Sequence, residues 1–296
     1  MSAIVPGAVP AVTTAAPAGP SRWANLRSVL SVAVRSASVD VGLVILVFWI
    51  VDAVAWHLFV PFDPLAQGGG NLLAPGGAHL LGTDNLGRDV LSRVLAGASS
   101  VLTLAPIGTL IGVALGTVVG LITGYYRGVA DTLIMRVVDA LLALPPIILA
   151  ALALSMLGTS EFAVALLIGV IFTPIVARTV RSAVMTERDA EYVAAARLRG
   201  ESGAYIMAAE ILPNVTAPII VEATVRFGYA IFIAGTLSFL SLGLQPPSPD
   251  WGLTVYTEQN FVQVQPWTVL GPAIALGTLV VSVSLVSDGL RKAMDS

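Results

Sequence analysis

The 296-residue chain has no cysteine, a single lysine and two histidines, and charged side chains make up only 11% of it. The absence of cysteine excludes disulfide bonds, thiolate metal ligands and a cysteine nucleophile. A nucleotide-binding P-loop ends in Gly-Lys followed by Ser or Thr, whereas Lys292 lies between Arg291 and Ala293. His57 and His79 do not have the spacing of a His-Glu-x-x-His zinc site. The sequence therefore predicts a chain that is not itself an ATPase and that carries no cofactor or metal.

Basic residues are also scarce, and the formal net charge is −3. A nucleic-acid partner is not expected without a basic patch. Apolar residues, by contrast, make up 56% of the chain, and soluble domains carry about 25% charged residues. We therefore predict an integral membrane protein surrounded by lipid.

Residues 1–20 are rich in Ala, Pro, Val and Thr and contain no charged side chain. This composition is typical of a disordered segment, and we expect residues 1–38 to form a partly disordered cytoplasmic tail. The apolar run that follows Arg35 is longer than the core of a signal peptide. We therefore expect it to stay in the protein as an uncleaved membrane anchor.

A helix needs about 20 mostly apolar residues to cross a bilayer, and six segments meet this requirement: 39–60, 98–124, 132–157, 162–180, 216–243 and 268–287. Prolines interrupt most of them, which membrane helices tolerate where neighbouring helices satisfy the freed carbonyl groups. In the second segment glycine recurs every four residues from Gly108 to Gly120, a stripe that favours close helix packing. The sequence thus predicts an all-α integral membrane protein with six transmembrane helices.

The Lys and Arg residues indicate how the chain crosses the membrane, because they gather on the cytoplasmic side. If the N-terminus is cytoplasmic, twelve of the 15 lie inside or at the inner edge of a span, Arg88 and Arg93 lie outside, and Arg226 lies within the fifth span. We therefore expect both termini in the cytoplasm. Residues 183–214 then form a cytoplasmic segment, and residues 61–97 form an extracytoplasmic loop.

The cytoplasmic segment contains a polar island, Glu191–Asn214, between two apolar spans. We predict a helix that ends near Leu198, a left-handed turn at Gly200 and a second helix capped by Ser202. Three consecutive alanines, Ala194 to Ala196, give the first helix a thin wall that a partner protein can approach closely. An amphipathic hairpin on the lipid surface, or a plain linker, is the alternative.

The extracytoplasmic loop is longer than a simple connector, so we expect it to be functional. Gly82 and Gly87 allow tight turns, and Asp84, Arg88 and Asp89 can tie the loop together. A loop whose ion pairs only hold its own shape is the alternative to one that meets a partner.

A second extracytoplasmic loop follows the fifth span, and three prolines between Gln245 and Trp251 stiffen it. Tryptophan is enriched at membrane–water interfaces. We therefore expect Trp251 and Trp267 to anchor this part of the chain at the interface.

Charged side chains inside spans are costly and often functional. Glu222 and Arg226 in the fifth span are four residues apart with Glu first, the favourable order for a helical ion pair. We predict a self-neutralising pair, and the alternative is a pair that faces a transport pathway or a partner. Asp139 lies three residues after Arg136, and we expect these two to pair in the same way.

The cytoplasmic pattern resembles the EAA loop of ABC-importer permeases, in which E-A-A, a glycine and Leu-Pro recur at set spacings. The matching ATPase-coupling positions are Glu191, Ala194, Ala195, Ala196, Arg197, Gly200, Leu212 and Pro213. Ala194 stands where the family has glutamate, and Glu191, one helical turn earlier, is the candidate to serve instead.

Three further segments follow the order found in dipeptide, oligopeptide and nickel importer permeases: 79–93, 239–252 and 287–291. The first resembles the family's GTDxxGRDxxSR pattern, and its candidate binding-protein-facing residues are Gly82, Thr83, Asp84, Gly87, Arg88 and Asp89. From about residue 79 to its end, the chain resembles an ABC-importer permease of the DppC/OppC type.

The resemblance implies a type I ABC importer permease fold, with the first transmembrane helix and loop at 39–97, the transmembrane core at 98–290 and a cytoplasmic tail at 291–296. It implies a non-catalytic subunit of the cytoplasmic membrane that forms half of a pathway for dipeptides or oligopeptides. The implied partners are a second homologous permease, two ABC ATPase subunits that hydrolyse ATP, and an extracytoplasmic substrate-binding protein that delivers the peptide.

Three alternatives to peptide import are open at this point. A nickel or haem importer permease of the same family shares these motifs. A self-sufficient secondary transporter often shows two internal repeats, and the sequence shows no convincing repeat. A membrane enzyme needs a catalytic constellation, and the in-span aspartates Asp52 and Asp139 lack flanking motif residues.

Overall fold

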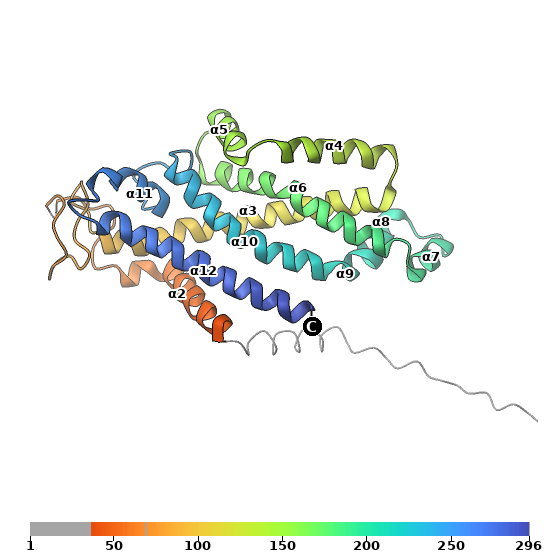
Figure 1. The fold of residues 1–296 in the computed structure, drawn as a ribbon, viewed down its shortest axis with the longest axis horizontal. Helices are drawn as coiled ribbons and strands as arrows, with labels where there is room; N and C mark the ends of the chain where they lie inside the picture. The colour runs from red at the N-terminus through yellow and green to blue at the C-terminus, as the bar shows by residue number, and fades with distance from the viewer. Residues whose placement is uncertain (1–36, 69, 296) are drawn as a thin grey trace, which may run out of the picture.

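The structure is a computed structural model that describes residues 37–68 and 70–295, so most of the predicted N-terminal tail lies outside the described residues. The described residues form helices and loops, and their only β-type pairing is one isolated bridge. In chain order the helices in Figure 1 are α2 (Ala37–Phe59), α3 (Val90–Tyr126), α4 (Val129–Ala143), α5 (Pro146–Leu157), α6 (Glu161–Glu187), α7 (Glu191–Leu198), α8 (Gly203–Tyr205), the π-helix η1 (Ile206–Ile211), α9 (Leu212–Asn214), α10 (Thr216–Phe239), α11 (Trp251–Glu258), the 3-10 helix η2 (Gln259–Phe261) and α12 (Trp267–Asp295).

Five of the described helices are long and apolar enough to cross a membrane: α2, α3, α6, α10 and α12. The predicted span 132–157 is not one straight helix, because α4 and α5 meet at a bend of 97°. Pro145 and Pro146 explain the bend, since proline lacks an amide hydrogen and disfavours the helical conformation at the residue before it. Leu144 is accordingly extended, with φ −84° and ψ 133°. With the bent pair counted as one span there are six, so the predicted all-α membrane fold is confirmed with one span broken.

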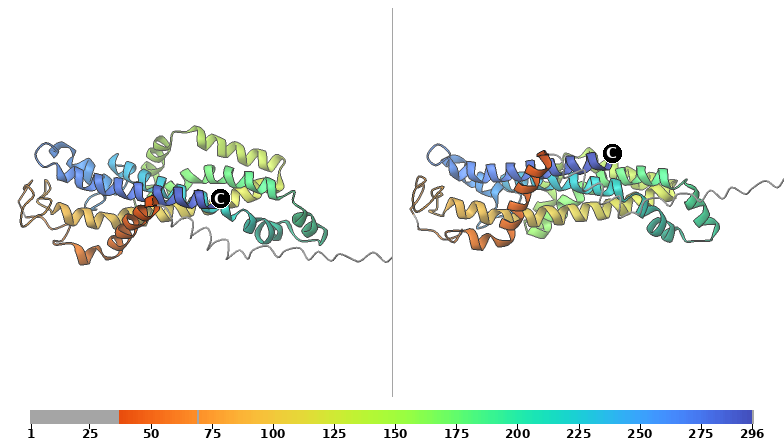
Figure 2. Two further views of the ribbon diagram at one scale, coloured as in Figure 1. Left: turned by 60° about the horizontal axis from the view of Figure 1, so that its bottom comes forward. Right: turned by 90° about the horizontal axis from the view of Figure 1, so that it is seen from below.

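The axis of the bundle is the pair α3 and α6, which lie side by side over most of their length (Figures 1 and 2). The glycine stripe of α3 makes this possible. A Cβ atom at Gly112 would lie 2.8 Å from Cβ of Phe172, and one at Gly116 would lie 2.6 Å from Cβ of Val176. Only residues without side chains permit the two backbones to approach so closely. The predicted role of the stripe in helix packing is confirmed.

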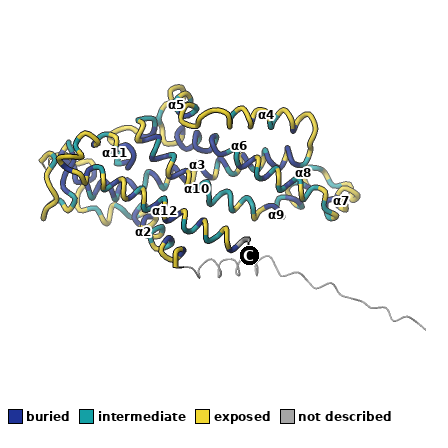
Figure 3. Tube along the Cα trace, viewed as in Figure 1, coloured by how far each residue is buried: buried dark blue, intermediate teal, exposed yellow. Residues whose placement is uncertain are grey.

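The bundle is elongated, and the two polar segments singled out in the sequence lie at its opposite ends (Figures 1 and 2). The loop between α2 and α3 lies beside α11 at one end, while α7, α8 and α9 form the other. α4 lies against α3 and α6, and most of its residues are exposed (Figure 3). The fold therefore presents two separate candidate sites, with the in-span charges between them.

Candidate functional site

The segment from α7 to α9, here called the hairpin, has the predicted helix–glycine–helix form. α7 ends at Leu198, and Gly200 has the left-handed φ of +79°. The hydroxyl of Ser202 accepts a hydrogen bond from the amide of Tyr205 at 3.2 Å and so caps the second helix. The three local predictions for this turn are confirmed.

The second half of the hairpin is irregular. The short α8 leads into the π-helical η1, and Leu212 and Pro213 begin α9. A proline fits there because the amides of a helix's first turn need no partner within the helix. The chain departs from regular helix at Val215, with φ −100° and ψ 10°, before α10.

The three alanines of α7 do not share one surface. Ala194 and Ala195 are exposed, whereas Ala196 is 0% exposed and packs with Val193 and Ile206 in an apolar cluster that continues into α6. The expectation that a partner closely approaches Ala196 is therefore wrong. This alanine closes the interior of the hairpin, because it lies three residues after Val193 on the same face of the helix.

The hairpin is held against the ends of α3 and α6. The guanidinium of Arg197 lies over the ring of Tyr125, 5.4 Å from its centroid, and donates to the carbonyl of Arg188 at 3.3 Å. A Cβ atom at Gly203 would lie 2.7 Å from the hydroxyl of Tyr126, so glycine permits a close approach there. Arg197 thus positions the hairpin on the transmembrane helices, a role that its place in the motif does not reveal.

Two polar contacts brace the same region. The hydroxyl of Tyr192 donates to Glu187 at 2.7 Å. Burial, reinforced by this carboxylate, raises the pKa of Tyr192 to about 12, so the phenol stays protonated at physiological pH. Arg199 pairs with Glu210 at 3.0 Å across the turn.

The tip of the hairpin carries an exposed apolar side chain that the sequence analysis missed. Leu198 is 89% exposed, and Tyr205 is about half exposed. Glu191 is exposed in the first turn of α7. The only sequence signal for Leu198 is one leucine between two arginines, which does not tell a surface residue from a core residue. An exposed apolar side chain with a polar rim suits a protein contact.

The outer loop is shorter than the predicted 61–97, because α3 already begins at Val90. Its residues, 60–89, are arranged around the carboxylate of Asp84. One oxygen accepts from the amides of Leu86 and Arg88, both at 2.9 Å, and the other accepts from Nε of Arg88 at 2.6 Å. Gly82 and Gly87 both have φ of +75°. The tight turns predicted at these glycines are confirmed.

Asp89 joins the loop to the transmembrane bundle. It caps α3 by accepting from the amide and the hydroxyl of Ser92 at 2.8 and 2.7 Å, and it contacts Nδ1 of His79 at 2.9 Å. The hydroxyl of Thr83 accepts from the amide of Leu73 at 2.8 Å. Both side chains are therefore used within the loop.

The charged side chains of the motif point into the protein. Asp84 is 1% exposed, Arg88 is 6% exposed and Asp89 is 2% exposed. The structure therefore corrects the expectation that these charges face a binding protein. It favours the alternative, in which their ion pairs hold the shape of the loop.

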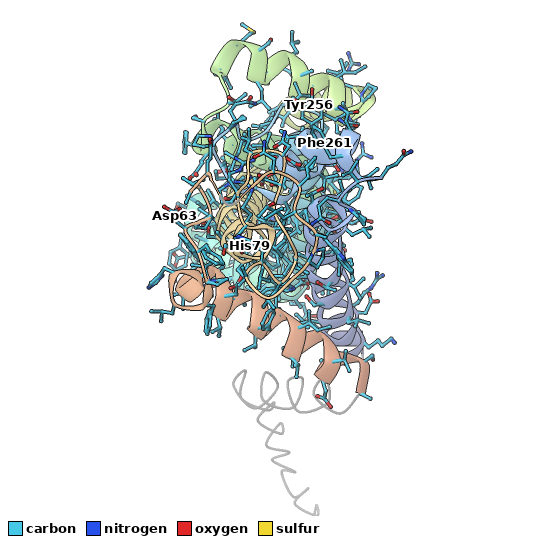
Figure 4. All side chains as sticks on the ribbon, turned by 90° about the vertical axis from the view of Figure 1, so that its left-hand side faces the viewer. Asp63, His79, Tyr256 and Phe261 are labelled. Carbon is cyan, nitrogen blue, oxygen red and sulfur yellow. The ribbon has the colours of Figure 1, made fainter. Side chains whose placement is uncertain are left out.

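The outer surface at this end is formed by other residues. Leu80 and Leu86 of the loop are exposed. Figure 4 looks onto this end and places Asp63 on the loop, with Tyr256 and Phe261 from α11 and η2 beside it. A partner that approaches this end would meet the loop and the α11 region together.

Buried polar groups tie the loop to the segment after α10. Glu258 at the end of α11 accepts from the amide of Asn85 at 3.3 Å, and the side-chain amide of Gln265 donates to the carbonyl of Leu73 at 2.6 Å. Burial, and secondarily the nearby carboxylate of Asp84, raises the pKa of Glu258 above its usual range. Sequence reasoning missed Glu258, because its partner is 173 positions away and no local pattern marks the pair.

Trp251 is not an interfacial anchor, so that expectation is wrong. Its side chain is fully buried, its indole N–H donates to the carbonyl of Val94 at 2.7 Å, and its ring packs edge-to-face on Trp49 with centroids 4.9 Å apart. Gly97 makes room for it, since a Cβ atom there would lie 2.5 Å from the indole ring. Trp267 remains partly exposed.

Charged side chains also lie between the two ends of the bundle. Glu222 and Arg226 form the predicted helical ion pair at 2.9 Å. Asp139 of α4 pairs with Arg178 of α6, and not with Arg136 as expected. Among the described residues, no three His, Asp or Glu side chains are grouped so that they could hold a metal ion.

An all-α bundle with five long apolar helices and one bent pair defines a multi-pass membrane protein. The family model described as "binding-protein-dependent transport system inner membrane component" matches residues 116–296. The chain belongs to this family, and the resemblance inferred from its motifs is confirmed.

Curated relatives extend the similarity over most of the chain. The dipeptide transport system permease protein DppC of Escherichia coli (strain K12) is 39% identical over 268 residues, which cover 88% of this chain and 89% of the relative. The protein of the same name from Haemophilus influenzae is 37% identical over 262 residues, 86% of this chain and 89% of the relative. The di/tripeptide transport system permease protein DppC of Pseudomonas aeruginosa is 37% identical over 242 residues, 79% of this chain and 80% of the relative.

Proposed function

We propose that this permease imports dipeptides or oligopeptides across the cytoplasmic membrane and forms half of the translocation pathway, the other half being a second homologous permease. Relatives that are named as dipeptide permeases and match over most of both chains support this substrate class. The chain contains no P-loop that could bind ATP, so on this proposal the energy comes from a partner. Two ABC ATPase subunits would supply it.

The observation that carries the proposal is the braced hairpin with its exposed tip. A coupling element must be rigid enough to transmit a movement of the ATPase to the transmembrane helices. The contacts of Arg197 and Gly203 join the hairpin to the end of α3. On this proposal Leu198 and the exposed residues of α7 enter a groove of the ATPase. The other coupling positions act by holding the hairpin in shape: Ala196, Arg197, Gly200, Leu212 and Pro213.

At the opposite end, the outer loop would receive a substrate-binding protein. The buried Asp84–Arg88 pair supports this indirectly, because it holds the loop in one conformation. Direct contacts would then come from the exposed surface, which includes Leu86, and not from the motif's charges. The distribution of Lys and Arg supports both termini in the cytoplasm, with this loop outside.

The test is reconstitution of the permease with its second permease and ATPases in liposomes, with ATP on the hairpin side and binding protein on the loop side. Uptake of a labelled dipeptide should require both ATP and the binding protein. Uptake of nickel or haem in place of peptide would contradict the substrate class. Uptake by the chain alone, driven by an ion gradient, would contradict the dependence on an ATPase and support a secondary transporter.

A further inference from the structure

The open face of α6 carries charge in a part of the chain where charge is costly. Arg178 and Ser182 are exposed, and Ile175 and Thr179 are half-buried beside them. These four residues, here called the α6 stripe, recur at the spacing of one helix face. The opposite face of α6 is buried against the glycine stripe of α3.

Two ion pairs flank the α6 stripe, one on each side. Arg178 pairs with Asp139 of α4. Thr179, the next residue, donates its hydroxyl hydrogen to Glu222 of α10 at 3.1 Å, and Glu222 pairs with Arg226 at 2.9 Å. The stripe therefore lies between α4 and α10. On the α4 side Asp139 pairs with Arg178 of the stripe itself, and on the α10 side lies the Glu222–Arg226 pair.

The Asp139–Arg178 pair lies near the inner edge of the predicted spans. Asp139 lies about 15 Å along α4 from its first residue and about 6 Å from its last, and Arg178 lies about 13 Å from the last residue of α6, at 1.5 Å per residue. Both side chains are 58% exposed. Charged side chains within membrane spans almost always face a water-filled cavity or the bundle interior. An exposed ion pair here indicates a surface that water or a polar solute reaches.

A second ion pair on α6 has a different environment. Arg181 binds Asp131 through two hydrogen bonds of 2.8 and 2.7 Å, and the Asp131 side chain is only 10% exposed. That pair is saturated and joins α4 to α6. The exposed Asp139–Arg178 pair has room for a further partner.

We propose that the α6 stripe, with Asp139–Arg178 and Glu222–Arg226 on its two sides, binds the charged ends of a zwitterionic peptide during its passage. This inference rests on the proposed function. A peptide ammonium group would pair with a carboxylate and a peptide carboxylate with a guanidinium, which can bind it through two N–H groups. The face of Tyr229, 5.3 Å from the Arg226 guanidinium, supports the positive charge.

Charge pairs that already neutralise each other suit a transient site. Without peptide, each acid is paired with its own arginine, so no bare charge is left in the membrane. When a peptide binds, its ammonium and carboxylate groups replace the contacts between each acid and its arginine, and the net charge of the site stays zero. The exchange keeps binding weak, as a transport pathway requires if the solute is to leave again.

Transport by the reconstituted complex at saturating loaded binding protein tests the proposal. Arg178→Gln and Arg226→Gln should each lower the dipeptide transport rate by about tenfold, the value of one charged hydrogen bond, while the ATPases stay bound. Arg226→Lys keeps the charge and should retain more transport than Arg226→Gln. Arg136→Gln is the matched control, since it removes an exposed charge from α4 outside the stripe and should transport normally.

Cysteine accessibility gives a second measurement that does not depend on transport, and the chain has no native cysteine. In the complex in lipid nanodiscs, without binding protein, Ser182→Cys should react with a water-soluble methanethiosulfonate reagent. A free dipeptide should slow this reaction, and the same dipeptide with acetylated and amidated ends should not. Leu133→Cys, on the exposed apolar side of α4, should stay unreactive in lipid.

The outcomes distinguish a failure of the peptide site from a failure of the proposed function. Normal transport by Arg178→Gln and Arg226→Gln would overturn this inference alone. So would an unreactive Ser182→Cys, which would mean that lipid or the second permease covers the stripe, and so would equal protection by the free and the blocked dipeptide. If the wild-type complex transports no dipeptide, the proposed function falls and this inference falls with it.

Discussion

The two polar ends of the molecule use similar residues in opposite ways. Each contains at least one glycine with positive φ and several charged side chains. In the outer loop the charges of the motif are buried, as with Asp84 and Arg88, and leucines are exposed. In the hairpin small apolar residues such as Ala196 are buried, most charges are exposed, and one leucine stands out at the tip.

The difference follows from what each end is packed against. The outer loop lies beside α11, which can pair with buried polar groups of the loop, as Glu258 does when it accepts from the amide of Asn85. The hairpin extends from the ends of α3 and α6 and is covered by nothing else in the described chain, so its charges stay in solvent (Figures 1 and 3). The charged residues of the motif at the outer end therefore hold the loop in shape, whereas those of the hairpin lie on its surface.

The largest expected effect is an all-or-none difference in labelling. Gly77→Cys in the outer loop should react with an impermeant thiol reagent applied to intact cells, and Ser202→Cys in the hairpin should not. Both positions are exposed, and a Cβ atom at Gly77 meets no other atom within 4 Å. Labelling of Ser202→Cys from outside would show that the two ends are not on opposite sides as proposed.

Loss of the buried charge pair should be the next largest effect. Arg88→Ala leaves the Asp84 carboxylate buried without its partner, which costs about 3–5 kcal/mol. We expect a lower thermal unfolding temperature of the purified complex and loss of binding-protein docking. Leu86→Ala, two residues before Arg88 on the exposed surface, is the control and should weaken docking without changing the unfolding temperature. An unchanged unfolding temperature for Arg88→Ala would show that the pair does not hold the loop.

The corresponding substitution at the other end should affect binding and not stability. Leu198→Asp places a charge at the exposed tip, and loss of a central apolar contact typically costs about 2 kcal/mol or more of binding free energy. ATPase subunits should therefore dissociate on dilution, while the unfolding temperature of the permease is unchanged. Leu198→Met should bind normally. Normal ATPase binding by Leu198→Asp would remove the tip from the proposed contact.

A change in the hairpin turn should have a moderate effect. Gly200 has φ +79° with open space around it, so only backbone strain opposes a side chain. A β-branched residue there costs about 1–2 kcal/mol, and Gly200→Val should reduce ATPase binding in a pull-down. Gly200→Asn should be milder, because asparagine tolerates this conformation. Equal effects of Val and Asn would mean that the left-handed turn is not what matters.

The smallest effect concerns pH at the outer end. Because burial raises the pKa of Glu258 above 4.5 in the folded protein, the folded state holds this proton more tightly than the unfolded chain. The contribution to stability is full below pH 4.5 and is lost as the pH rises through the folded-state pKa. As the pH rises, the unfolding temperature of Glu258→Gln should therefore fall less steeply than that of the wild type. Parallel curves would contradict a role for this carboxylate.

Local features were predictable from the sequence because their causes are local. The turn at Gly200, the cap at Ser202 and the ion pair between Glu222 and Arg226 each depend on residues a few positions apart. The glycine stripe of α3 was also visible, since its four-residue period marks one helix face. The bend at Pro145 was underestimated, because prolines are common in membrane helices and only some of them break the helix.

Contacts between distant segments were not predictable in the same way. Trp251 was expected at the interface and is buried against Trp49, and Asp139 was expected to pair within its own helix and pairs with Arg178. In both cases the observed contact is with a residue of another helix, and the sequence does not show where that helix lies.

The sequence by itself determined that this is a helical membrane protein, which segments are apolar enough to cross a bilayer, where the chain turns, and to which permease family it belongs. Hydropathy, glycine and proline act on neighbouring residues, so they can be read along the chain. Only the tertiary structure decided which polar side chains face inward, which leucine is exposed at the hairpin tip, and that α6 holds a charged open face between α4 and α10. Those outcomes depend on the packing of segments that are far apart in sequence, because a buried charge is tolerated only where a partner from another element satisfies it.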